Sequence, residues 1–161
     1  MRVGSTEATA AEINRVLHRF LRAARVGRLE SWSRLLAGIS FLDLGILRMA
    51  AQRPDIILKE VREKLSVPQS TLTSAVDRLE RRKLLRRVIS SRDRRSYGLE
   101  LTPEGRRVDE EHERLDRLSA ELLVEALGGG RDVQRFLEML SKICRRFEEA
   151  AEQSKEKADE S

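Results

Sequence analysis

The feature that most constrains the fold is a pair of short amphipathic segments with almost no linker between them. Apolar residues recur at helical spacing over residues 58–65 and again over residues 69–82. The two segments are separated by Ser66, Val67 and Pro68 alone. Two short helices in such quick succession are typical of a helix-turn-helix.

The second segment has one apolar side and one polar side. A single stripe at helical spacing, which predicts a buried face, is formed by Leu72, Ala75, Val76 and Leu79. The opposite side presents Ser70, Ser74, Asp77 and Arg81, with Thr73 and Arg78 at its edges.

The next segment predicts a hairpin of two strands with a basic turn. Residues 84–89 and 97–101 have the composition of strands, and the polar residues 90–95 join them. The arginines around the turn are Arg86, Arg87, Arg92, Arg94 and Arg95, with Asp93 as the only acid between them. Like charges held close together repel each other, so the cluster predicts a polyanionic partner; the alternative is a hairpin whose charges only confer solubility.

The helix pair and the hairpin together predict a winged helix-turn-helix domain over residues 38–102. The expected fold class is mainly α with a small β-wing, with added N- and C-terminal dimerisation helices. Residues 1–37 and 103–150 are assigned to this helical dimerisation region. Residues 151–161 are expected to form a polar tail that frays.

Several residues predict where helices begin and end. The first helix is expected to kink at Gly27 and to continue through Leu29, Trp32, Leu35 and Leu36 until Gly38 stops it. A capping box of Ser40 and Asp43 predicts a helix over residues 41–52.

A long helix should follow Thr102 and run from Pro103 to about Leu127, because threonine caps helices and proline suits the first helical position. Three consecutive glycines, residues 128–130, then predict a break before a last helix that begins near Asp132. The terminal helices have wider apolar stripes than a small winged domain covers, which favours a homodimer.

Charge is segregated along the chain. Residues 53–107 hold 15 Lys/Arg and 8 Asp/Glu, whereas residues 108–161 hold 9 and 15. A basic middle favours a nucleic acid as partner, with an anionic membrane surface as the alternative. The apolar runs are too short to span a bilayer and the first residues lack a signal-peptide core, so we expect a cytoplasmic protein without membrane contact.

The sequence offers no pattern that predicts catalysis, a cofactor or a metal. Cys144 is the single cysteine, and His18 and His112 lie far apart. We therefore expect no enzymatic activity, no cofactor and no metal site. The position of Cys144 on the apolar side of the last helix favours a packing role over a redox role.

The polar start of the second helix is a candidate for reading base edges in the major groove. Its hydroxyl and amide side chains are Gln69, Ser70, Thr71, Thr73 and Ser74. The cations that follow, candidates for phosphate contacts, are Arg78, Arg81, Arg82 and Lys83. Arginines in the hairpin suit a narrow minor groove, since their planar heads are weakly hydrated.

Two of these segments resemble the MarR family of transcriptional regulators, and the resemblance extends over about residues 10–148. Residues 93–105 are similar to the wing motif of the family, Asp-x-Arg leading into Leu-Thr-x-x-Gly. Residues 70–80 are similar to its recognition helix. The resemblance implies a dimer with interleaved terminal helices and two winged domains, bound to a pseudo-palindromic operator in double-stranded DNA.

The resemblance also assigns roles. Major-groove and phosphate contacts are implied for Ser70, Thr71, Thr73, Ser74 and Arg78. In the wing, Asp93 would orient its neighbours while Arg95, with Arg94, enters the minor groove, and Arg92 is counted among the DNA-binding residues. Asp77 is expected to orient an arginine, because phosphate repels a carboxylate.

The predicted function is a homodimeric, sequence-specific regulator of transcription that acts as a repressor. The alternatives are a winged-helix module that binds protein and an architectural DNA binder indifferent to sequence. The resemblance allows a small-molecule effector at the junction of the dimerisation and DNA-binding regions. Trp32 is a candidate to line that site, although a core or dimer contact is the commoner role for tryptophan.

Three residues depart from the family pattern. Lys83 stands where a glycine is common, which predicts either another turn geometry or a costlier backbone. Pro68 replaces a capping serine. Gly98 lies inside a strand, which predicts a bulge or a flexible wing.

Overall fold

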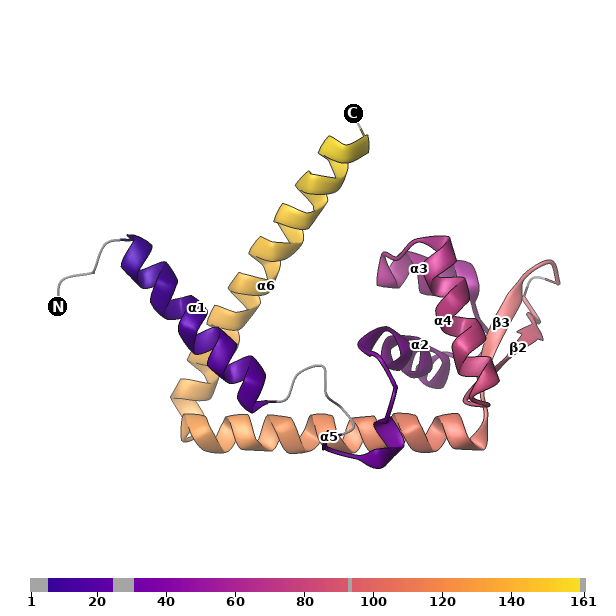
Figure 1. Cartoon of the computed structure of the whole chain (residues 1–161), viewed down its shortest axis with the longest axis horizontal. Helices are drawn as coiled ribbons and strands as arrows, with labels where there is room; N and C mark the ends of the chain where they lie inside the picture. Colours follow the sequence, from indigo (N-terminus) through magenta and orange to yellow (C-terminus); the bar gives the residue numbers. More distant parts are fainter. Residues whose placement is uncertain (1–5, 25–30, 93, 160–161) are drawn as a thin grey trace. The chain divides into compact units, whose positions relative to one another are not determined.

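The computed structural model of the chain describes residues 6–24, 31–92 and 94–159. The chain divides into two compact units, residues 1–115 and residues 116–161, and the boundary falls inside the long helix α5 (Pro103–Leu127). Helix α1 (Thr6–Ala23) belongs to the first unit and α6 (Gly130–Asp159) to the second. Figure 1 labels these elements.

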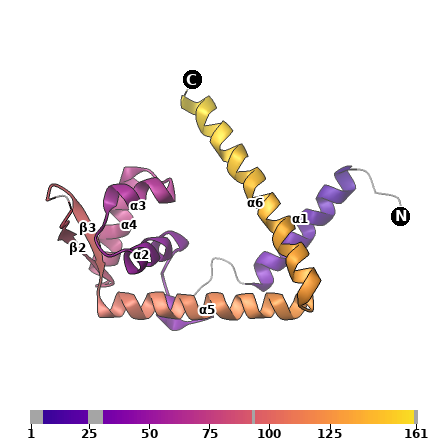
Figure 2. The same ribbon diagram turned by 180° about the vertical axis from the view of Figure 1, so that it is seen from behind.

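The first unit contains the predicted winged helix-turn-helix. Its elements in chain order are α2 (Phe41–Gln52), β1 (Ile56–Ile57), α3 (Leu58–Leu65), α4 (Gln69–Arg81), β2 (Leu85–Ile89) and β3 (Tyr97–Leu101). Helices α2, α3 and α4 group beside the strands in both Figure 1 and Figure 2. The fold class is confirmed: the structure is mainly helical with a small antiparallel sheet.

The sheet has the strand order β1-β3-β2, and both pairings are antiparallel. β3 is central, because Gly98 lies opposite Val88 of β2 on one side and Ile57 of β1 on the other. The two strands of the hairpin were expected from the sequence. The short strand β1, which ties the hairpin to the start of α3, was not.

The core of this unit is built from the apolar stripe on α4 and the helices and strands that face it. Leu72, Ala75, Val76 and Leu79 are each at most 1% exposed, as the helical spacing predicts. Helix α4 contacts α2 and β2. Other buried residues of this unit, on α2, α3 and the sheet, include Ile46, Leu47, Val61, Leu85 and Leu99. Full burial of each such side chain stabilises the fold by about 1.5–3 kcal/mol before entropy is counted.

Local signals fix most of the helix ends. At the start of α2, the Ser40 hydroxyl accepts a hydrogen bond from the Asp43 amide, and an Asp43 carboxylate oxygen accepts one from the Ser40 amide. This confirms the predicted capping box. At the start of α3, Glu60 accepts a hydrogen bond from the Ile57 amide at 3.0 Å.

The prediction of one helix that continues from α1 through Leu36 is wrong where the structure describes that segment. Leu35 and Leu36 lie in a separate 3-10 turn, η2 (Arg34–Leu36), which begins at Ser33. The Ser33 hydroxyl accepts a hydrogen bond from the Leu35 amide, so a side-chain cap begins a new turn here. Gly27 and Leu29, where the kink and the continuation were expected, lie outside the described residues.

Gly98 has a different role from the predicted one. It pairs in regular register with Val88, so the strand has no bulge at this position. A Cβ atom on Gly98 would lie 2.7 Å from the Asp55 carboxylate. A larger residue at this position would therefore have to displace that side chain.

Lys83 adopts the costlier backbone, one of the two outcomes predicted from its departure from the family pattern. Its φ is +57°, in the left-handed region that favours glycine. Pro68 stands at the N-cap of α4 without a side-chain hydrogen bond, as its lack of a polar side chain requires.

The second unit consists of the end of α5, the glycine break and α6. Gly128, Gly129 and Gly130 all have positive φ, which confirms the predicted break. Helix α6 continues to Asp159, so residues 151–159, where fraying was expected, are helical. Alanine, glutamate, glutamine and lysine dominate this stretch, and these residues have high helix propensity.

Large apolar side chains stay exposed on the terminal helices. On α1 they are Ile13, Val16, Leu17, Phe20 and Leu21, and on α6 they are Leu137, Met139, Leu140, Ile143 and Phe147. Cys144 is also exposed, so the chain by itself does not give it the packing role expected from the sequence. None of the described helices is long and apolar enough to cross a membrane.

Candidate nucleic-acid interface

The first two turns of α4 present an exposed polar face. Its members are the predicted residues Gln69, Ser70, Thr71, Thr73 and Ser74, all of which are exposed. The amide of Gln69 donates to the Thr73 hydroxyl at 3.5 Å and its carbonyl oxygen accepts from Arg62 at 3.5 Å. The first amide groups of a helix also lack partners within the helix, so this end of α4 offers further donors to an anion.

Arg78, a predicted DNA-binding residue, lies between α4 and α2. Its guanidinium donates to the carboxylate of Asp43, at 2.6 Å, and Asp43 is 1% exposed. This ion pair joins α4 to the capping box of α2. It gives Arg78 a structural role between the two helices, although part of its side chain stays exposed.

The phosphate candidates at the end of α4 also include an arginine that is bound within the chain. Arg82 donates to the carbonyl oxygens of Gly38 and Ala37, at 2.7 and 2.8 Å, and so holds the turn before α2. Arg81 and Lys83 are exposed. Arg82 is exposed as well, but its guanidinium is bound to the chain's own carbonyl oxygens.

Carboxylates neutralise the arginines of the hairpin strands. Arg87 donates to Asp77 at 2.6 Å and also pairs with Glu80, both on α4. Arg86 pairs with Glu100 across the two strands at 2.8 Å. The predicted role of Asp77, to orient an arginine, is confirmed.

These pairs correct the charge argument made from the sequence. The argument treated the arginines around the turn as one repelling cluster that required a polyanion. Arg86, Arg87 and Arg92 each have carboxylate partners within the chain. Repulsion among unpaired arginines is therefore no argument for a polyanion, and the observation that remains is the exposure of Arg94 and Arg95 at the tip.

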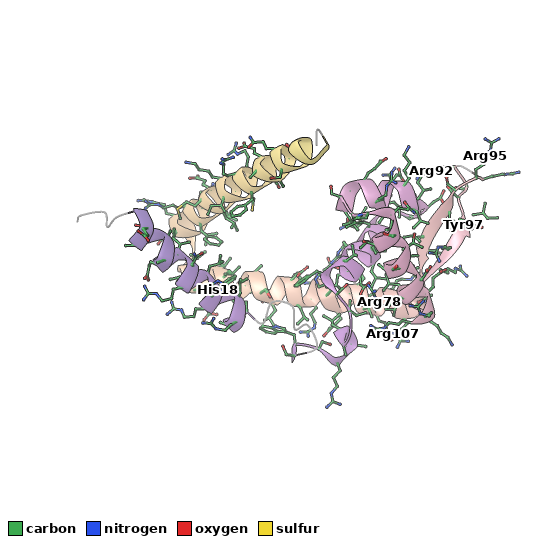
Figure 3. All side chains as sticks on the ribbon, turned by 45° about the horizontal axis from the view of Figure 1, so that its top comes forward. His18, Arg78, Arg92, Arg95, Tyr97 and Arg107 are labelled. Carbon is green, nitrogen blue, oxygen red and sulfur yellow. The ribbon has the colours of Figure 1, made fainter. Side chains whose placement is uncertain are left out.

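Arg92 lies at the base of the turn, bound to two segments that are distant in sequence. Its Nη2 donates to a carboxylate oxygen of Glu60 at 2.6 Å and to the backbone carbonyl of Asp55 at 3.0 Å. The Asp55 carboxylate accepts from the Ser90 hydroxyl at 3.1 Å and from the Ser91 hydroxyl at 2.7 Å. Figure 3 shows Arg92 at this place, between the turn and α3.

The protonation of this group follows from its hydrogen bonds. The bond from Arg92, with that from the Ile57 amide, lowers the pKa of Glu60 to about 2. The bond from Ser91 lowers the pKa of Asp55, against the opposing effect of partial burial. The bond to Glu60 raises the pKa of Arg92. All three groups are therefore charged at neutral pH.

The tip of the hairpin presents its cations to solvent. Arg94 and Arg95 are both exposed, and Figure 3 shows Arg95 at the far end of the hairpin, pointing away from the helices. Asp93, to which the sequence assigned an orienting role, lies outside the described residues. The site thus combines the polar face of α4 with a tip that carries two arginines.

The geometry agrees with the comparison to known proteins. The model of the MarR family matches residues 37–96, the segment from the turn before α2 to the end of the hairpin turn. This segment is therefore similar to the MarR family. A search of curated proteins gave no significant match.

Solved structures show the same fold over most of the chain. FabT from Streptococcus pneumoniae, solved in complex with DNA, has 24% identity and a TM-score of 0.64 over 89% of this chain and 95% of that one. PcaV from Streptomyces coelicolor, solved with its natural ligand, has 24% identity and a TM-score of 0.59 over 94% and 97%. A MarR/EmrR family transcriptional regulator from Acinetobacter sp. ADP1 has 16% identity and a TM-score of 0.61 over 91% and 99%.

Apart from Asp77, sequence reasoning missed the acidic partners of the arginines in this segment. Asp43 was interpreted only as a capping residue, and Glu60 was not singled out, since capping accounts for a carboxylate at the third helical position. Asp55 follows Pro54 and reads as an ordinary turn residue. The one available signal was the excess of arginine around the hairpin, which requires counter-charges somewhere in the fold.

Proposed function

We propose that the protein is a homodimeric regulator of transcription that binds double-stranded DNA in a sequence-specific way. The observation that carries the proposal is the presence, on one domain, of an exposed hydroxyl and amide face on α4 and an exposed arginine tip on the wing. The wing is the hairpin of β2, β3 and the turn between them.

The polar face of α4 suits the major groove. An α-helix fits that groove, and short side chains such as Ser70 and Thr71 let the helix approach the base edges closely. Gln69 carries an amide that can bond adenine through two atoms. The buried stripe on the other side of α4 keeps this face turned outward.

The wing tip suits the minor groove or the adjoining phosphates. Arg94 and Arg95 are exposed at the tip of the wing. Insertion of arginine into a narrow minor groove is favoured by its strong negative potential.

The apolar faces of α1 and α6 support the proposal of a homodimer. A monomer that exposed this many large apolar side chains on long amphipathic helices would aggregate, and symmetric pairing buries the same face on both copies. A dimer presents two copies of α4 to one duplex, so the operator is proposed to be a pseudo-palindrome with half-sites roughly one helical turn apart, about 34–36 Å.

Two finer parts of the proposal concern regulation. A dimer that occupies a promoter blocks access to it, so the expected effect on transcription is repression, which an in vitro transcription assay with the selected site tests. A small-molecule effector is proposed at the junction of the dimerisation helices and the winged domain. Its support is the fold shared with PcaV, which was solved with its natural ligand.

The experiment is selection of duplexes from a random library by the purified protein, followed by affinity measurements over a salt series. Enrichment of a pseudo-palindrome and a steep fall of affinity with salt are expected. Equal enrichment of all sequences would favour an architectural DNA binder, and no binding in dilute buffer would favour a protein-binding module. Either result contradicts the proposal.

The wing has its own test on the selected duplex. Arg95→Ala should weaken binding by about 1–3 kcal/mol. The matched control is Arg145→Ala, which removes the same charge from an exposed position on α6. Equal affinities for the two variants would remove the wing tip from the mechanism.

A further inference from the structure

We propose that Asp55, Glu60 and Arg92 form a clamp that positions the wing for DNA, and that Arg92 acts through this clamp rather than by touching DNA. The inference rests on the proposed DNA binding and names how one part of that site is held in place. It also assigns Arg92 a role different from the DNA contact that the sequence suggested.

The clamp joins three separate segments. Arg92 belongs to the turn of the wing, Glu60 to the first turn of α3, and Asp55 to the loop before β1. Arg92 spans both acidic residues, since its Nη2 lies 2.6 Å from Glu60 and 3.0 Å from the Asp55 carbonyl. Arg53 adds a second cation on Glu60 at 2.8 Å. The base of the wing is thereby fixed to the helix-turn-helix.

Asp55 holds the same turn by its side chain. Its carboxylate accepts hydrogen bonds from the Ser91 amide at 3.1 Å and from the hydroxyls of both Ser90 and Ser91. The Arg92 amide in turn donates to the Ser90 hydroxyl at 3.2 Å. Backbone amides and side chains of residues 90–92 are therefore both held by hydrogen bonds, directly before the tip at Arg94 and Arg95.

The clamp explains two features of the backbone that are otherwise unfavourable. Asp55 has a φ of +62°, a conformation that non-glycine residues rarely adopt. Gly98 interrupts a strand with a residue of low strand propensity, and a Cβ there would meet the Asp55 carboxylate at 2.7 Å. Both features place that carboxylate over the strand beside the turn.

The hydrogen bonds of Arg92 argue against a direct DNA contact. Its guanidinium donates to both oxygens of Glu60 and to the Asp55 carbonyl, and its Nε lies 3.8 Å from the Asp55 carboxylate. To reach a phosphate, the side chain would have to break these bonds and give up its pairing with both carboxylates, which would leave Glu60 with Arg53 alone. Arg94 and Arg95 begin only two residues further on, so the clamp sets where the tip lies relative to α4.

The variant Glu60→Gln should change the affinity for DNA in opposite directions, depending on whether Arg92 contacts DNA or positions the wing. Glutamine keeps the acceptor for the Ile57 amide, so the start of α3 stays capped while the charge pair is lost. If Arg92 touched DNA, removal of the competing carboxylate would add a net positive charge and tighten binding. The clamp predicts weaker binding, by roughly tenfold, because the tip loses its position.

The matched control is Glu100→Gln. It removes the same charge from a carboxylate that pairs with Arg86 on the same sheet but lies outside the clamp. Its affinity for the selected duplex should equal or slightly exceed that of the parent protein. Tighter binding by Glu60→Gln, or equal weakening by both variants, would overturn the clamp.

A second measurement uses no DNA and keeps the two proposals distinguishable. In the free protein, amide hydrogen exchange at Ser91 and Arg92 should be faster in Glu60→Gln than in Glu100→Gln, because the turn is released. Unchanged exchange would contradict the clamp even if DNA binding were confirmed. If the parent protein did not bind DNA but the two variants still differed in amide exchange, the proposed function would be contradicted and the contacts of the clamp would stand.

Discussion

The winged segment and the terminal helices use the same kinds of apolar residues in opposite ways. Leu79 in α4 and Val61 in α3 are 0% exposed, whereas Leu140 and Ile143 in α6 are 43% and 52% exposed. The winged segment buries most of its apolar side chains within one chain, so it should be stable by itself. The terminal helices have apolar faces that only another surface can cover, so their stability should depend on association.

The largest effect is expected from a cavity in the winged core. Leu79→Ala should lower the free energy of unfolding by about 2–5 kcal/mol, since the side chain is fully buried and its neighbours are fixed. Urea denaturation at several protein concentrations measures it. The matched variant Leu140→Ala should show an effect that depends on protein concentration, and a concentration-independent loss of equal size would break the comparison.

The next effect is expected from a charge on the apolar face of α6. Ile143→Asp should weaken dimerisation by about 100-fold or more, because each copy would bury an unpaired carboxylate at the interface. Sedimentation measures the dissociation constant. Lys142→Asp places a carboxylate on the opposite side of the helix and should leave the dimer intact; a dimer that survives Ile143→Asp would show that this face is not the interface.

A smaller effect is expected where a charge pair connects two helices of the winged segment. Asp43→Ala should lower the free energy of unfolding by about 2 kcal/mol, because it removes the capping box of α2 and the partner of Arg78. Asp77→Ala, whose side chain is 43% exposed, should cost under about 1 kcal/mol. Thermal unfolding of the two variants compares them directly. Equal losses of stability would contradict the expectation that the buried carboxylate contributes more than the exposed one.

The smallest effect, with the opposite sign, is expected at the end of α4. Lys83→Gly should raise the free energy of unfolding by about 1 kcal/mol, since glycine adopts a positive φ without steric cost. Denaturation of the parent and the variant under the same conditions checks this. A loss of stability would mean that Lys83 makes a favourable contact that outweighs its backbone strain.

Local sequence signals predicted the parts of the fold that depend on a few neighbouring residues. The capping box at Ser40, the limits of α3 and the buried stripe of α4 agree with the structure, because each is determined within one or two helical turns. The polar face of α4 followed from the same periodicity. The failure at residues 31–36 has a local cause as well, since a serine cap there competed with an apolar pattern.

The roles of the arginines were harder to predict from the sequence. Arg78 and Asp43 are 35 residues apart, and Arg92 and Glu60 are 32 apart, so their pairing depends on tertiary packing. Residue type alone made these arginines look equivalent to Arg94 and Arg95. Only the positions of the carboxylates divide the cations that hold the domain together from those that face outward.

Gly98 should constrain which substitutions occur among relatives of this chain. Any side chain at this position would displace the Asp55 carboxylate from its place above the strand. Among relatives, the glycine and the aspartate should therefore be gained or lost as a pair, and a lineage that replaces one should show a rearranged turn. Libraries designed to alter DNA preference should leave both positions fixed and vary the exposed start of α4.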